Sequence, residues 1–341
     1  MPLLVDGTQI EDTFDCSSKS IFKRFGELTT RSKHFITNGI PRKRILSEND
    51  QYRTLFVGQK EFAVISSNLN VGKFDWVASD DATTCHILVL KEPRTNTFGM
   101  VHVDGFGETE NDIRSIISTM QHCMQLLDDG NSTDLDCQFS LDLFLFGGFI
   151  DDKCYSEPIA SSIFDIARRS PHNINLKLAC CCSLNDTVVS GRHRPIIYGV
   201  AVNLQNQALE IATCNSQNQG PDMLLRNARL MHNATREENS YNIYDYAEGC
   251  VVIEPFTIRK PSYGAEMLRL PDSVYLQYCS TSPHCESAHF VENSKNTIRF
   301  ALKYRNQNER IFRGKARKWK LDLVTGKWCL VLSEIHKELM A

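Results

Sequence analysis

The chain has 341 residues, of which 42% are hydrophobic and 23% charged, and this is the usual balance of a globular protein. Its formal net charge of −3 argues against the basic surface that nucleic-acid binding requires. No stretch approaches the roughly 18 uninterrupted apolar residues of a membrane span, so we expect neither a nucleic-acid partner nor a membrane.

The cysteine content indicates a reducing compartment. The chain has 13 cysteines, and the opening residues 1–10 lack the charged start and longer apolar run of a signal peptide. We therefore expect free thiols and a cytoplasmic location, with the nucleus as an alternative. Since no repeat or linker divides the chain, we predict a single domain over residues 1–341 and a monomer.

Apolar patterns along the chain predict a mixed α/β fold. The strands are expected at 55–66, 87–90, 98–104, 138–146, 174–182, 196–204 and 249–256. Apolar residues at helical spacing predict a helix over 110–127, and further helices are expected over 158–169 and 289–304. A terminal hairpin is expected over 315–332, with its turn at Thr325-Gly326.

Cys85 stands where a polar turn leads into a predicted core strand. The next strand carries His102 between two valines, and the polar residues 91–97 predict a hairpin turn between the strands. Two antiparallel strands joined in this way bring Cys85 and His102 side by side. The pair fits thiol catalysis, but the same spacing also occurs where both residues only pack in a core.

A metal site is the alternative interpretation of the cysteines and histidines. The chain has no Cys-x-x-Cys pair, and no cysteine pair accompanies His284 and His289. Cys180, Cys181 and Cys182 are consecutive in a predicted strand, where neighbouring side chains point to opposite faces. We therefore expect them to fill the core without converging on one ion, and we predict no metal and no cofactor.

Short motifs are spread along most of the chain. The most specific is Ser79-Asp80-Asp81-Ala82-Thr83-Thr84-Cys85-His86, and the others lie at 1–5, 147–152, 197–203, 280–283 and 289–292. In this order they resemble the eukaryotic protein N-terminal asparagine amidohydrolase family, whereas residues 11–53 match poorly and form a divergent segment. The family is similar to a wider group of cysteine deamidases, which includes the bacterial chemoreceptor glutamine deamidase and the necrotizing-factor toxins. That similarity implies an α-β-α sandwich with mixed and antiparallel sheets.

The resemblance also implies a reaction. The side-chain amide of an N-terminal asparagine in a protein or peptide is hydrolysed to aspartate and ammonia, upstream of ubiquitin-dependent degradation in the N-degron pathway. Cys85 is implied as the nucleophile that forms a thioester, His102 as its base, and Ser79 as the third catalytic residue. Ser280 is a second candidate for that third place. His86 should point to the opposite face of its strand and ranks below His102.

Substrate binding requires an oxygen acceptor for the free α-ammonium group. The acidic candidates near the predicted site are Asp80, Asp81, Asp104, Asp151 and Asp152, and the sequence does not choose among them. The Gly147-Gly148 pair ends a predicted strand and would let a peptide approach the backbone, although a plain turn explains it equally well. Backbone N–H groups near Cys85 are the expected oxyanion donors.

Two other functions stay open from the sequence. One is a deamidase that acts on internal glutamine, as the chemoreceptor and toxin relatives do. The other is a non-catalytic protein that binds N-termini, against which the presence of Cys85, His102 and Ser79 argues.

Overall fold

The computed structural model describes residues 3–46, 53–105, 109–127, 139–214, 219–230 and 239–331. Helices and strands are mixed along the chain, so the predicted α/β class is confirmed. Two larger sheets and two small ones are present among the described residues. Of these residues, no helix is both long and apolar enough to cross a bilayer.

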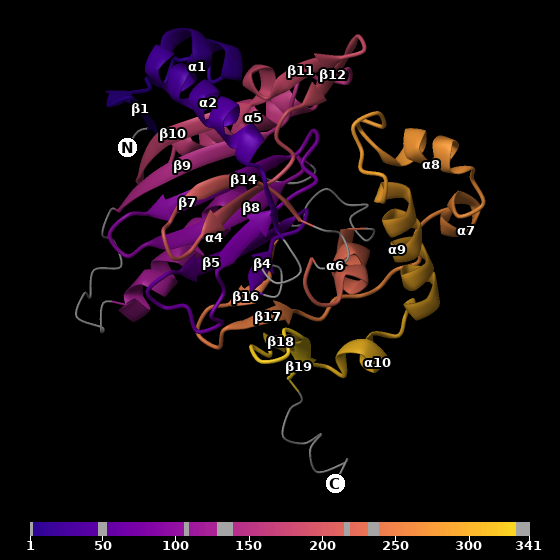
Figure 1. Ribbon diagram of the computed structural model, residues 1–341. Helices are drawn as coiled ribbons and strands as arrows, with labels where there is room; N and C mark the ends of the chain where they lie inside the picture. Colours follow the sequence, from indigo (N-terminus) through magenta and orange to yellow (C-terminus); the bar gives the residue numbers. More distant parts are fainter. Residues whose placement is uncertain are drawn as a thin grey trace.

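An eight-stranded sheet occupies the centre of the molecule (Figure 1). Its strands follow the order β15 (Tyr241–Asn242), β5 (Glu61–Ser66), β8 (Thr97–Val103), β7 (His86–Glu92), β9 (Ser140–Gly147), β10 (Asn173–Cys181), β1 (Leu3–Val5) and β2 (Thr8–Gln9). The pairs from β5 to β9 are antiparallel, whereas β9, β10 and β1 run parallel. The strand that follows Cys85, β7, therefore lies between β8 and β9 near the middle of the sheet.

Helices cover one face of this sheet. They are α4 (Thr109–Leu127), α5 (Ser156–Arg168) and α1 (Ser18–Arg24). Ile116 and Met120, one turn apart on α4, pack in one core with Leu88 and Leu90 of β7. Alternate residues of β7 thus meet the helices, as the period of a strand requires.

A second, five-stranded sheet packs against the opposite face. Its order is β3 (Arg44–Leu46), β14 (Leu209–Cys214), β13 (Val200–Asn203), β6 (Trp76–Ser79) and β4 (Thr54–Phe56). Ile87 and Val89 of β7 share a core with Val77 of β6 and Val200 of β13. The helix α2 (Gly26–Gly39) lies beside β10, where the Ser32 hydroxyl accepts a hydrogen bond from the Ala179 N–H at 3.0 Å.

The C-terminal third adds a group of helices beside the two sheets (Figure 1). They are α6 (Met223–Leu230), α7 (Gly264–Met267), α8 (Asp272–Cys279), α9 (Phe290–Tyr304) and α10 (Asn308–Phe312). A four-stranded sheet lies below α6 and beside α10 in Figure 1, in the order β16 (Tyr244–Asp245), β17 (Cys250–Ile253), β18 (Arg317–Leu321) and β19 (Trp328–Leu330). The hairpin of β11 (Asp186–Val189) and β12 (Arg192–Pro195) stands apart.

Most predicted elements are present, with shifted ends. The helices expected over 110–127, 158–169 and 289–304 correspond to α4, α5 and α9, and β18 pairs with β19 in the expected terminal hairpin. Residues 138 and 332, at the ends of two predicted elements, lie outside the described residues. The divergent segment contains α1, α2 and the short 3-10 helix Ile40–Arg42, none of which was predicted.

The single strand predicted over 55–66 is wrong. The chain turns after Phe56, where the Glu61 N–H donates to the Gly58 carbonyl and Lys60 takes a φ of 56°. Residues on either side of this turn form β4 and β5, which belong to different sheets. The local sequence is apolar on both sides, so its pattern did not reveal the break.

Candidate active site

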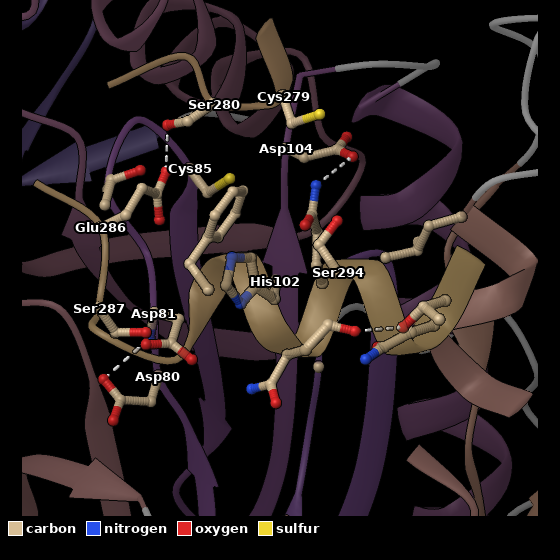
Figure 2. Close-up of a pocket in the computed structure, with 18 of the residues that line it drawn as sticks. Asp80, Asp81, Cys85, His102, Asp104, Cys279, Ser280, Glu286, Ser287 and Ser294 are labelled. Atoms are coloured by element: carbon tan, nitrogen blue, oxygen red, sulfur yellow. Dashed lines mark hydrogen bonds between the residues drawn. The ribbon is translucent and has the colours of Figure 1, made fainter. Parts of the chain in front are cut away.

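Cys85 and His102 lie on the same face of the central sheet. In the pairing of β7 with β8, His102 is opposite Ile87 and His86 is opposite Val103. Cys85 is two residues from Ile87 and directly precedes β7, so its side chain shares the face of Ile87 and His102. Both residues line one cavity of about 360 Å³ (Figure 2). His86 lies on the opposite face.

Ser79 holds the imidazole of His102 from the second sheet. It is the last residue of β6, fully buried, and its Oγ lies 3.0 Å from Nδ1 of His102. The other ring nitrogen, Nε2, is buried and has no hydrogen-bond partner among the described residues. One nitrogen is therefore positioned by the hydroxyl, and the other is free to exchange a proton with a thiol.

The surroundings of Cys85 and His102 favour the neutral form of both side chains. Burial raises the pKa of the Cys85 thiol well above its ordinary value, and the negative charges of Asp104 and Glu286 raise it further. Burial lowers the pKa of His102 to about 4, although the charge of Glu61 opposes this shift. Near neutral pH the site consequently holds a protonated thiol beside an uncharged imidazole.

The cavity wall is acidic. Asp80, Asp81, Asp104 and Glu286 all line it. Asp80 already binds backbone, because its carboxylate accepts the N–H groups of Asp81 at 2.8 Å and Cys214 at 2.7 Å. Burial, together with the charge of Asp81, raises the pKa of Asp80 to about 7. The Asp104 carboxylate accepts a hydrogen bond from the Gln59 amide at 2.9 Å.

Glu286 is a cavity residue that the sequence analysis missed. Its carboxylate accepts a hydrogen bond from the Ser280 hydroxyl, and burial raises its pKa to about 7. Ser280 Oγ in turn accepts the N–H of Ser282 at 2.9 Å. A signal was available, because Glu286 lies between the two motifs at 280–283 and 289–292.

Segments far apart in the sequence close the cavity. The hydroxyl groups of Thr84 and Thr281 lie 2.8 Å apart and join the turn before Cys85 to the chain that follows α8. Met223 and Asn227 of α6 and Phe290 and Ser294 of α9 add further wall (Ser294 is labelled in Figure 2). The site is therefore assembled from both sheets and the C-terminal helices.

Gly147 and Gly148 lie behind Cys85 and do not line the cavity. The Gly148 N–H donates to the Cys85 carbonyl at 2.9 Å, and a Cβ at Gly147 would come within 2.4 Å of that oxygen. Both glycines have positive φ, 98° and 60°. This placement gives them a part in holding the backbone of Cys85.

Four other predicted residues, Asp151, Asp152, His284 and His289, are also not among the residues that line the cavity. Asp151 accepts the N–H groups of Tyr155 and Ser156 at the start of α5, each at 2.9 Å. The His284 Nε2 lies 2.9 Å from the His193 carbonyl, and His289 directly precedes α9. Of the predicted residues, the structure brings together Ser79, Asp80, Asp81, Cys85, His102, Asp104 and Ser280.

A second cluster lies on the other face of β7. The three consecutive cysteines were predicted not to converge, and Cys180 does pack in the core of the other face of β10. Cys181 and Cys182 nevertheless share one face, because β10 ends at Cys181 and Cys182 has a φ of 49° at the start of a 3-10 turn. Strand alternation stops there. The two sulfur atoms and a ring nitrogen of His86 all lie within 4.8 Å of one another.

The chain is similar to one family of known proteins along most of its length. The family model "Protein N-terminal asparagine amidohydrolase" matches residues 45–330, a span that contains every residue lining the cavity. The chain is 29% identical over 314 residues to the protein N-terminal asparagine amidohydrolase of Mus musculus, covering 92% of this chain and 93% of the relative. The Homo sapiens protein of that name is 28% identical over the same length. The Arabidopsis thaliana protein is 26% identical, covering 76% of this chain and 75% of the relative.

Proposed function

Because the chain belongs to the protein N-terminal asparagine amidohydrolase family, which consists of amidases, we propose that it hydrolyses the side-chain amide of N-terminal asparagine with Cys85 as nucleophile. The observation that carries this mechanism is the cavity shared by Cys85 and His102, whose imidazole is hydrogen-bonded to Ser79. The products are an N-terminal aspartate and ammonia, which makes the reaction a deamidation step of the N-degron pathway.

The proposed reaction has two halves. His102 Nε2 accepts the thiol proton, and the sulfur of Cys85 attacks the carboxamide carbon. The C–N bond then breaks, His102 delivers its proton to the departing ammonia, and a thioester remains. Water, deprotonated by the same imidazole, attacks the thioester and releases aspartate and the thiol. Ser79 accepts the Nδ1–H throughout and so keeps Nε2 available as a base.

The substrate's own charge activates the thiol in this proposal. Asp104 and Glu286 both raise the pKa of Cys85, so the free site disfavours a thiolate. An α-ammonium group bound beside these carboxylates offsets their charge and lowers the thiol pKa. Internal glutamine brings no such cation. The acidic wall therefore favours a free N-terminal residue over the internal side chain that the alternative glutamine deamidase would use.

A matched set of peptides tests the substrate class. We expect ammonia release, and a mass gain of about one dalton, from a peptide with a free N-terminal asparagine. The same peptide with an acetylated N-terminus, with N-terminal glutamine, or with glutamine at an internal position should react far more slowly. Preferred turnover of the internal-glutamine or acetylated peptide would reject the proposed role of the ammonium group.

Glu286 is proposed as the main receptor of the α-ammonium group. Its pKa of about 7 means that protonation removes the needed negative charge as the pH falls through neutrality. We therefore expect kcat/KM, which reports the free enzyme, to decline below about pH 7. Glu286→Gln should abolish this decline at low pH, the acid limb of the pH profile. It should also raise KM by about 10- to 100-fold, which corresponds to the loss of one hydrogen bond to a charged group.

The exposed Glu292 of α9 provides the control for this profile. Glu292→Gln should leave both KM and the acid limb unchanged. An acid limb that persists in Glu286→Gln would instead point to Asp80, whose pKa is also raised to about 7.

The two candidate serines should separate by kinetic effect. Ser79 contacts the base, so Ser79→Ala should lower kcat by about 10- to 100-fold with little change in KM, as for other residues that orient a reacting group. Ser280 contacts Glu286, so Ser280→Ala should act mainly on KM. Steady-state kinetics with the asparagine peptide measure both values. The opposite pattern would make Ser280 the third catalytic residue.

The broader organisation belongs to the same proposal. We propose one domain acting as a monomer in the cytoplasm, related to the α-β-α sandwich of cysteine deamidases. The helices α4 and α5 on one face of the central sheet support that relation, although the second sheet packs against the opposite face and α2 contributes to both cores, through Leu28 and Ile36. Light scattering that gives a mass other than 38.8 kDa in solution would contradict the monomer.

A further inference from the structure

The cluster of His86, Cys181 and Cys182 is not used by the proposed reaction. All three residues are buried, with exposed fractions of 0%, 0% and 3%. The Cys182 Sγ lies 3.9 Å from His86 Nε2, and contact with the Cys182 thiol raises the pKa of Cys181. Two thiols and an imidazole thus meet in a space from which water is largely excluded.

The imidazole of His86 is poorly satisfied by its neighbours. Its Nδ1 is buried and has no hydrogen-bond partner among the described residues, and Nε2 has only the weak thiol contact. A buried polar atom without a partner is destabilising, so its presence requires an explanation. Burial lowers the pKa of His86 to about 3, which leaves the ring in the neutral form that coordinates metals.

We propose that His86, Cys181 and Cys182 bind a thiophilic d10 cation, Zn²⁺ or Cu⁺. Two sulfur ligands and one imidazole nitrogen form a donor set that both ions accept. Metal–sulfur bonds of about 2.3 Å and metal–nitrogen bonds of about 2.0 Å place ligand atoms roughly 3.5 to 4 Å apart. Ligand atoms that lie within 4.8 Å of one another reach this geometry by small side-chain movements.

Binding is a ligand exchange without oxidation or reduction. The Sγ–H bonds of Cys181 and Cys182 break, two metal–sulfur bonds form, and the two protons pass to the buffer. His86 contributes a lone pair and loses no proton from its coordinating nitrogen. With two thiolate ligands the Zn²⁺ site is neutral, and the Cu⁺ site carries a net charge of −1.

A second cavity provides the entry route. It has a volume of about 560 Å³ and is lined by Cys182, the exposed Cys154 and Asp151, among other residues. The charge of Asp151 raises the pKa of His86 against the effect of burial, which shows that it acts electrostatically on the cluster. A cation therefore reaches Cys182 from the side of the sheet opposite the Cys85 cavity.

The site also connects to the nucleophile through the backbone. His86 directly follows Cys85 and begins β7, so an ion held by His86 restrains the strand end from which the Cys85 side chain projects. The ion takes no part in amide hydrolysis. Metal binding by this cluster can therefore be tested without reference to the substrate of the Cys85 site.

Competition with a coloured chelator tests the site on the full-length, reduced protein. Zn²⁺ and, under anaerobic conditions, Cu⁺ are titrated separately, and the arm with the higher affinity identifies the ion. The native chain should hold one equivalent against the chelator. Cys181→Ser and Cys182→Ser should each weaken binding by at least about 100-fold, since loss of even a supporting residue costs 10- to 100-fold.

Cys180→Ser is the matched control. Cys180 is the neighbouring buried cysteine, but it packs in the core on the other face of β10, so its replacement should leave binding unchanged. Absence of binding by the native chain, or equal binding by Cys182→Ser, would overturn the proposal.

Protection from alkylation gives a second measurement that needs no substitution. With one equivalent of the ion, Cys181 and Cys182 should react more slowly with a maleimide in brief denaturant pulses, as mapped by mass spectrometry. Protection confined to other cysteines, such as Cys250, would place the ion elsewhere and reject the site.

Discussion

Replacing Cys85 by alanine is expected to abolish hydrolysis of an asparagine-initiated peptide, with a loss in kcat of about 10⁴-fold or more. The thiol of Cys85 forms the covalent bond to the substrate in the proposed mechanism, so its removal prevents the first half of the reaction. Cys85→Ser should be nearly as inactive, because a serine hydroxyl gives up its proton far less readily than a thiol and is a poorer nucleophile. Mass spectrometry of the peptide over time measures the remaining turnover.

Cys279 supplies the control for this experiment, since it is a second cysteine that lines the cavity. Cys279→Ala should retain most of the activity. Full turnover by Cys85→Ala would reject the nucleophile, and loss of activity in Cys279→Ala alone would move it to that residue. No turnover by the native chain with any N-terminal or glutamine peptide would favour the alternative of a non-catalytic protein that binds N-termini.

The second large effect is expected on stability, from Glu61→Gln. The Glu61 carboxylate binds the guanidinium groups of Arg226 and Arg229, and all three side chains are at most 4% exposed. Loss of the carboxylate leaves two buried cations without their counter-ion, which typically costs about 3–5 kcal/mol of the free energy of unfolding. The ion pairs also attach α6, which lines the cavity, to β5. Urea denaturation measures the change.

A partly exposed acidic residue provides the comparison. Glu110 forms ion pairs with Arg114 and Arg169 on the surface, and Glu110→Gln should leave the denaturation midpoint almost unchanged. A Glu61→Gln protein as stable as the native chain would show that the buried ion pairs contribute little beyond the desolvation that they cost.

The Glu61 ion pairs also predict the sign of a pH effect. Burial alone would raise the pKa of Glu61, but Arg226 and Arg229 together hold it below its ordinary value. A depressed carboxylate pKa contributes stability above the unfolded pKa of about 4.3, and this contribution disappears as the pH falls through the lower folded value. Acid should therefore destabilise the native chain more than Glu61→Gln.

Local sequence was sufficient to predict the centre of the site. β7 carries a continuous apolar run, β8 carries His102 between two valines, and a polar turn separates the two strands, so their pairing as a hairpin followed from the local sequence. The helix α4 followed in the same way from its repeat of apolar residues. Cys85 and His102 were accordingly predicted on neighbouring strands, and the structure places them on one face.

Contacts between distant segments decided the rest. Glu286 follows Cys85 by about 200 residues and reaches the cavity only because the chain after α8 packs against Thr84. Asp80 and Asp81 are neighbours in the sequence. The Asp80 carboxylate accepts the N–H of Cys214 only because β14 packs beside it in the folded protein. The turn between β4 and β5 and the convergence of Cys181 with Cys182 depend on backbone conformations that side-chain periodicity does not encode. The period of apolar residues gives the direction of side chains within one helix or strand. A site formed by several elements also depends on how these elements are placed relative to one another, and only tertiary packing determines that.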